Sequence, residues 1–90
     1  MKINKAIQEF VNSAIASGYV SKEDRYYLLN RVLYLVGEES FESSKEVEQP
    51  SLLDAMANLV EAAVEACKIA NDPEERDWLE QELMNLVIPK

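Results

Sequence analysis

The chain has 90 residues, 48% of them hydrophobic, which suffices for one hydrophobic core. Nine basic and seventeen acidic residues give a net charge of −8, which argues against nucleic acids and anionic membranes as partners because both recruit cationic segments. The chain has no histidine and one cysteine, so most metal-site and nucleophilic chemistry is excluded and we expect neither a metal nor a cofactor.

The cysteine content also bears on the cellular compartment. Cys67 is the only thiol, so no internal disulfide can form, whereas secreted domains of this size usually contain several. The N-terminus lacks the uninterrupted apolar stretch of a signal peptide, and no run approaches the 18–20 or so apolar residues of a membrane span. We therefore expect a cytoplasmic protein.

The first half of the chain contains two predicted helices. Apolar residues recur three and four positions apart over residues 3–17, and Gly18 follows where a left-handed residue ends a helix. A second helix is predicted over 22–36, ending at Gly37. Its apolar residues cover more than one face, so we expect it to lie centrally or to meet a second partner.

A capping box is predicted at the start of the second helix. The Ser21 hydroxyl is placed to accept a hydrogen bond from the backbone amide of Asp24. The Asp24 carboxylate is placed to accept one from the backbone amide of Ser21. Residues 38–50 follow the helix as an acidic, mobile linker, because five glutamates and few large apolar residues leave little to bury. A fully solvated loop is the simpler interpretation, and an acidic docking segment is the alternative.

The second half contains two further predicted helices. Ser51 is expected to cap a helix over 51–68. Asp72 and Pro73 give the strongest start signal in the sequence, a cap followed by proline at the first helical position. The carboxylate of Glu75 is expected to complete a capping box, and the helix runs over 73–87.

The two halves of the chain also align with each other. The aligned blocks are residues 10–20 with 59–69, and residues 24–36 with 75–87. The second block places Arg25 on Arg76 and Tyr27 on Trp78, and both arginines are expected to form ion pairs. The sequence therefore predicts an all-α fold, a four-helix unit made of two antiparallel helical hairpins with approximate two-fold symmetry.

Few side chains offer chemistry. The carboxylates of the fourth helix are expected to form a solvated face and not a catalytic pair; they are Glu74, Glu75, Asp77, Glu80 and Glu82. Cys67 lies on the apolar stripe of the third helix, where a small buried hydrophobe is the simplest interpretation.

The second helix carries the candidate interaction surface. Tyr27 and Tyr34 are seven residues apart and share a face with Arg31, and both residue types are enriched in interface hot spots. Partial burial of Tyr27 is the alternative interpretation. The candidate interface residues are Tyr26, Tyr27, Asn30, Arg31 and Tyr34.

The second helix also carries a family resemblance. Residues 24–37 resemble the beginning of bacterial family-2 galactose-1-phosphate uridylyltransferases. The residues of the Asp-x-x-Tyr-x-x-Asn pattern and its continuation are Asp24, Tyr27, Asn30, Leu33 and Gly37. Residues 14–18 resemble the end of that family's first helix, and residues 82–89 resemble the stretch that leads into the rest of the enzyme.

The resemblance implies a non-catalytic N-terminal helical domain of a longer enzyme, with a scaffolding or assembly role. Such enzymes exchange the uridylyl group between UDP-glucose and galactose-1-phosphate, and related ones form a covalent uridylyl-histidine. This chain has no histidine, so no catalytic residue carries over. The implied partner is the remainder of the transferase chain, or a second copy. The alternative is a free-standing acidic helical protein-interaction module.

Overall fold

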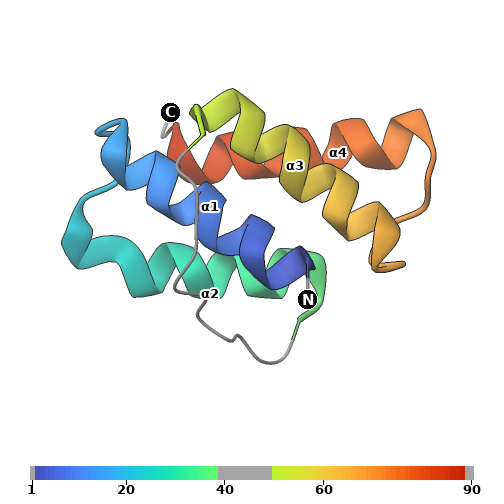
Figure 1. The fold of residues 1–90 in the computed structure, drawn as a ribbon, viewed down its shortest axis with the longest axis horizontal. Helices are drawn as coiled ribbons and strands as arrows, with labels where there is room; N and C mark the ends of the chain where they lie inside the picture. Colours follow the sequence, from blue (N-terminus) through green and yellow to red (C-terminus); the bar gives the residue numbers. More distant parts are fainter. Residues whose placement is uncertain (1, 39–49, 89–90) are drawn as a thin grey trace.

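The computed structural model describes residues 2–38 and 50–88, which contain four α-helices and no strand (Figure 1). The helices are α1 (Lys2–Ala16), α2 (Arg25–Val36), α3 (Leu52–Glu65) and α4 (Pro73–Val87), with a short 3-10 helix at Lys22–Asp24 before α2. The all-α prediction is confirmed. Most of the expected acidic linker, residues 39–49, lies outside the described residues.

The helices form two antiparallel hairpins, α1 with α2 and α3 with α4, as predicted (Figure 1). The two hairpins meet mainly through α1 and α3, and α2 also contacts α4. Of the two options predicted for α2, the central position is excluded, because α1 and α3 form the middle of the bundle, and contact with a second partner stays a prediction. The Ser13 hydroxyl of α1 donates to the Pro50 carbonyl over 2.8 Å and holds the start of α3 against α1.

Apolar stripes from all four helices meet in one core. Phe10, Leu59, Leu79 and Leu83 are fully buried. The aligned positions of the two hairpins bury the same kinds of residue: Val11 with Val60, Ala14 with Ala63, Leu28 with Leu79, and Val36 with Val87. The match continues towards the N-terminus of α1 and α3, where Ala6 and Ile7 are buried like Ala55 and Met56. Burial of matched residues at matched positions supports the internal repeat, since each hairpin contributes an equivalent half of the core.

The repeat extends to a polar contact between the helices of each hairpin. The Arg25 guanidinium of α2 donates to the Asn12 side-chain carbonyl of α1 over 2.6 Å. At the aligned positions, the Arg76 guanidinium of α4 binds the Glu61 carboxylate of α3. The predicted ion pair is thus confirmed for Arg76, whereas Arg25 forms none within residues 2–38 and 50–88, because the acceptor aligned with Glu61 is an uncharged amide.

Three helices are followed within two residues by a residue with left-handed backbone. Gly18, Gly37 and Cys67 have φ of 82°, 74° and 60°. In each case the next amide donates to a carbonyl five residues back, at 3.1, 2.9 and 2.8 Å, which is the Schellman arrangement. This geometry ends α3 at Glu65, three residues before the predicted end. It also turns Cys67 into solvent, so the predicted burial of the thiol is wrong.

The caps of the second half are largely as predicted. The Ser51 hydroxyl accepts from the Asp54 amide at 3.3 Å, and the Asp72 carboxylate accepts from the Glu74 amide at 2.7 Å. Pro73 begins α4. The carboxylate of Glu75 does not close a capping box, because it accepts instead from the Ala70 amide at 2.8 Å.

The cap predicted at Ser21 is wrong. The Asp24 amide donates to the Ser21 backbone carbonyl in the 3-10 turn, at 3.1 Å. The Ser21 hydroxyl therefore accepts no hydrogen bond from that amide. It donates instead to the Asp24 carboxylate over 3.0 Å. The α-helix consequently begins only at Arg25.

Candidate functional site

The five candidate interface residues lie on the outward side of α2, and we call this surface the tyrosine face. The side chains of Tyr26, Tyr27 and Tyr34 are 76%, 67% and 84% exposed. Asn30 and Arg31 are also exposed. The sequence left open whether Tyr27 is partly buried, and the structure places it in solvent with the others.

Helical spacing explains why these five residues gather. Residues three, four and seven apart share a helix face, and positions 26, 27, 30, 31 and 34 satisfy these spacings. The opposite side of α2 is held in the core by Leu28, Val32 and Val36. Because that buried stripe fixes the rotation of the helix, the tyrosines must point away from the bundle.

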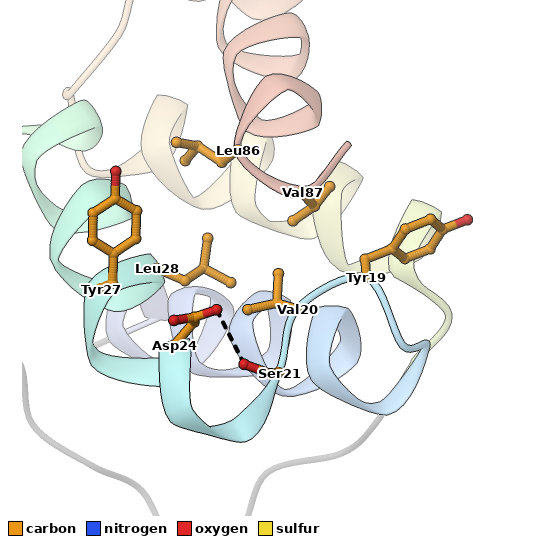
Figure 2. Close-up of a pocket in the computed structure, with 8 residues that line it drawn as sticks. All are labelled: Tyr19, Val20, Ser21, Asp24, Tyr27, Leu28, Leu86 and Val87. Atoms are coloured by element: carbon orange, nitrogen blue, oxygen red, sulfur yellow. Dashed lines mark hydrogen bonds between the residues drawn. The ribbon is translucent and has the colours of Figure 1, made fainter. Parts of the chain in front are cut away.

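A hollow of about 380 Å³ adjoins the tyrosine face where α2 begins and α4 ends (Figure 2). Its lining residues are Tyr19, Val20, Ser21, Asp24, Tyr27, Leu28, Leu86 and Val87. Figure 2 shows Tyr27 and Tyr19 on opposite sides, with Leu28 and Val20 between them and Leu86 and Val87 reaching in from α4. The hollow is therefore largely apolar.

The polar groups of this hollow do not suit an anionic ligand. Ser21 and Asp24 are bonded to each other, and no lysine or arginine among the described residues lines the hollow. A phosphate placed here would meet the carboxylate of Asp24 without a compensating cation. The lining suits an apolar side chain better.

A second hollow, of about 360 Å³, shares Tyr19 and Val87 with the first. Its remaining lining is mostly apolar and includes Leu52, Leu53, Met56, Met84 and Ile88. The exposed apolar residues outside α2 include Tyr19, Leu53 and Ile88, which gather at this end of the bundle. Neither hollow was predicted from the sequence.

Other reactive groups are not brought together. Among the carboxylates of α4, Glu74, Glu75, Asp77 and Glu80 are exposed and Glu82 is half-buried. Exposed carboxylates lack the burial with which enzymes tune a general acid. Within residues 2–38 and 50–88, no three histidine, cysteine or acidic side chains form a group that could hold a metal. No helix in the same described ranges is long and apolar enough to cross a membrane.

Comparison with known proteins finds similarity over nearly the whole chain. The chain is 35% identical over 83 residues to the galactose-1-phosphate uridylyltransferase of Streptococcus mutans, and 36% identical over 83 residues to galactose-1-phosphate uridylyltransferase 1 of Streptococcus pneumoniae serotype 4. The Streptococcus thermophilus enzyme of the same name is 32% identical over 84 residues.

These matches cover 92–93% of this chain but only 16–17% of each relative. The chain thus spans about one sixth of the length of the curated relatives it matches. No family model matches the chain, and no solved structure matches it.

Proposed function

We propose that this chain is the N-terminal helical segment of a galactose-1-phosphate uridylyltransferase, in which it serves folding and assembly and takes no part in the chemistry. The observation that carries the proposal is similarity along 92% of the chain to one sixth of such enzymes. The catalysis then belongs to the other five sixths of the enzyme.

The chemistry of the chain supports a non-catalytic role. Transfer of a uridylyl group through a covalent intermediate needs a nucleophile that attacks the phosphorus and later leaves. The imidazole that related enzymes use for this purpose has no counterpart, because the chain contains no histidine.

The fold supports a scaffolding role. The chain buries an apolar core with residues from all four helices and leaves the tyrosine face outside. A uridylyltransferase acts on sugar phosphates and nucleotide sugars, which are intracellular metabolites, so the proposal includes residence in the cytoplasm.

The proposal is tested by two measurements on purified proteins. The 90-residue chain is assayed for uridylyl transfer from UDP-glucose to galactose-1-phosphate, with the S. mutans enzyme as the active control, and we expect no turnover. Deletion of the matching segment from the S. mutans enzyme should reduce the yield of assembled enzyme. Turnover by the isolated chain, or full yield after deletion, would contradict the proposal.

The exposure of the tyrosine face also favours the alternative, a free-standing interaction module. The two functions differ in where the reading frame ends. A frame that continues far beyond Lys90 supports the transferase, whereas a frame that stops there supports the free-standing module. Sedimentation of the isolated chain as a monomer that captures no partner would count against the module.

A further inference from the structure

The internal repeat provides a control for the tyrosine face, because α2 and α4 occupy equivalent places. The inward positions match, with Leu28, Val32 and Val36 buried like Leu79, Leu83 and Val87. The outward positions differ except at one, where Tyr27 of α2 aligns with Trp78 of α4 and both are exposed. At the positions aligned with the tyrosine face, α4 carries Asp77, Trp78, Gln81, Glu82 and Asn85.

Comparing α2 with α4 shows which outward residues the fold does not require. A helix in this position is accommodated with an outward face that is mostly charged or amide-bearing, as α4 demonstrates. The tyrosines without an aromatic counterpart on α4, Tyr26 and Tyr34, therefore serve something other than packing of the bundle. Tyrosine offers a large contact area at low entropic cost and is enriched in binding hot spots.

The charge of the tyrosine face identifies the chemistry of its partner. Arg31 is its only charged residue, whereas the equivalent positions of α4 carry two carboxylates. Arg31 forms no ion pair within the described residues, although the chain carries a net charge of −8. An unpaired guanidinium among tyrosines is suited to a carboxylate on another surface.

The size of the tyrosine face argues against a second copy as that partner. At about 200 Å² per aromatic side chain, full burial of the three tyrosines removes roughly 450 Å² from solvent. A stable complex between separate proteins buries about 800 Å² on each partner. A two-fold contact centred on this face would also bring the Arg31 side chains of the two copies together.

A small contact is sufficient when both surfaces belong to one polypeptide. The linkage then supplies an effective concentration in the millimolar range, so less buried area is needed. We propose that the tyrosine face docks the remainder of the transferase polypeptide, through an apolar surface that offers a carboxylate to Arg31. An apolar side chain of that surface enters the hollow beside Tyr27. This inference rests on the proposed function.

The test uses the complete transferase polypeptide that contains this chain. A photoreactive benzoylphenylalanine replaces Tyr34 in one variant and Asn85, its equivalent on α4, in the other. After irradiation, mass spectrometry locates the cross-linked peptides. We expect position 34 to cross-link within the same polypeptide to a segment beyond residue 90 that contains an aspartate or glutamate, and position 85 to give little such product.

A charge reversal then tests the carboxylate. Arg31→Glu should lower the cross-link yield from position 34 about tenfold, which corresponds to about 1.4 kcal/mol. Replacing the facing carboxylate by lysine should restore the yield. Glu82→Arg, the matched reversal on α4, should leave the yield unchanged.

The outcomes separate this inference from the proposed function. Absence of uridylyl transfer by the unmodified polypeptide overturns the proposed function, and the inference with it. An active polypeptide in which positions 34 and 85 cross-link equally overturns the inference alone. Cross-links between two copies, or an Arg31→Glu variant with unchanged yield, also overturn it.

Discussion

Replacing Cys67 by glycine is expected to stabilise the chain. Cys67 is the only non-glycine residue with positive φ in the described ranges, at 60°. Its side chain is exposed, so its removal forfeits little packing. The aligned residue at the end of α1 is Gly18, which already adopts this backbone without a Cβ penalty.

The magnitude follows from two opposing effects. A left-handed backbone costs a residue with a Cβ about 1–2 kcal/mol. Glycine gains additional freedom in the unfolded chain, which offsets about 0.4–1 kcal/mol of that relief. The free energy of unfolding should therefore rise by about 0.5–1 kcal/mol, and the Tm by about 2–8 °C for a chain of this length.

The assay is urea unfolding followed by far-ultraviolet circular dichroism, with a reductant present because the thiol is exposed. Cys67→Ala is the matched control, since it removes the thiol but keeps the Cβ, and its stability should stay near that of the original chain. Gly18→Ala is the reverse experiment. Apart from Gly18 itself and its two chain neighbours, no described residue lies within 4 Å of the new Cβ, so the strained backbone alone should lower the free energy of unfolding by about 1 kcal/mol.

Two results would refute this reasoning. One is a Cys67→Gly chain no more stable than the original. The other is a Cys67→Ala chain as stable as Cys67→Gly, which would assign the effect to the thiol and not to the backbone.

Three further experiments test single hydrogen bonds. Ser13→Ala should cost about 1–2 kcal/mol of unfolding free energy in the same urea assay, because the Pro50 carbonyl loses its donor; an unchanged midpoint would contradict this. Arg25→Ala and Asn12→Ala in a double-mutant cycle should couple by about 0.5–1.5 kcal/mol, whereas strictly additive losses would mean that the bond contributes nothing. Asp72→Ala should lower the free energy of unfolding by about 1 kcal/mol and Asp72→Ser by much less, because serine can also cap the helix. Equal losses would show that the cap is not the cause.

Much of the fold could be predicted because its signals are local. The bounds of α4 coincide with the predicted 73–87, since the Asp72 cap and Pro73 fix the first turn chemically. The apolar stripes likewise indicate which side of each helix is buried. The two hairpins follow from short connections, which force neighbouring helices to run antiparallel.

The predictions fail where a sequence pattern does not determine the backbone geometry at a helix end. The apolar spacing of α3 predicts a helix that includes Cys67, whereas the helix ends at Glu65. The repeat contained the missing signal, because it aligns Cys67 with Gly18 at the end of α1. At Ser21, spacing alone does not decide whether the hydroxyl or the backbone carbonyl receives the Asp24 amide.

The candidate site was predictable only in part. Helical spacing gathers the tyrosines on one face, but the exposure of Tyr27 depends on how the core turns α2. The hollow beside Tyr27 was beyond prediction, because Leu86 and Val87 reach it from α4 across the bundle. Periodicity describes single helices, and it does not place two of them together.

The repeat also indicates how folding and assembly are divided within this chain. The inward residues of α2 and α4 are interchangeable in kind, since both helices bury leucine and valine against the same core. The outward residues are free of that demand, because a side chain such as Tyr34 is 84% exposed and contributes little to the stability of the bundle. A duplicated hairpin therefore supplies two equivalent outer surfaces. That of α4 is polar apart from Trp78, whereas that of α2 carries three tyrosines and an arginine that forms no ion pair among residues 2–38 and 50–88, so the surface that we propose for docking differs without any change to the core.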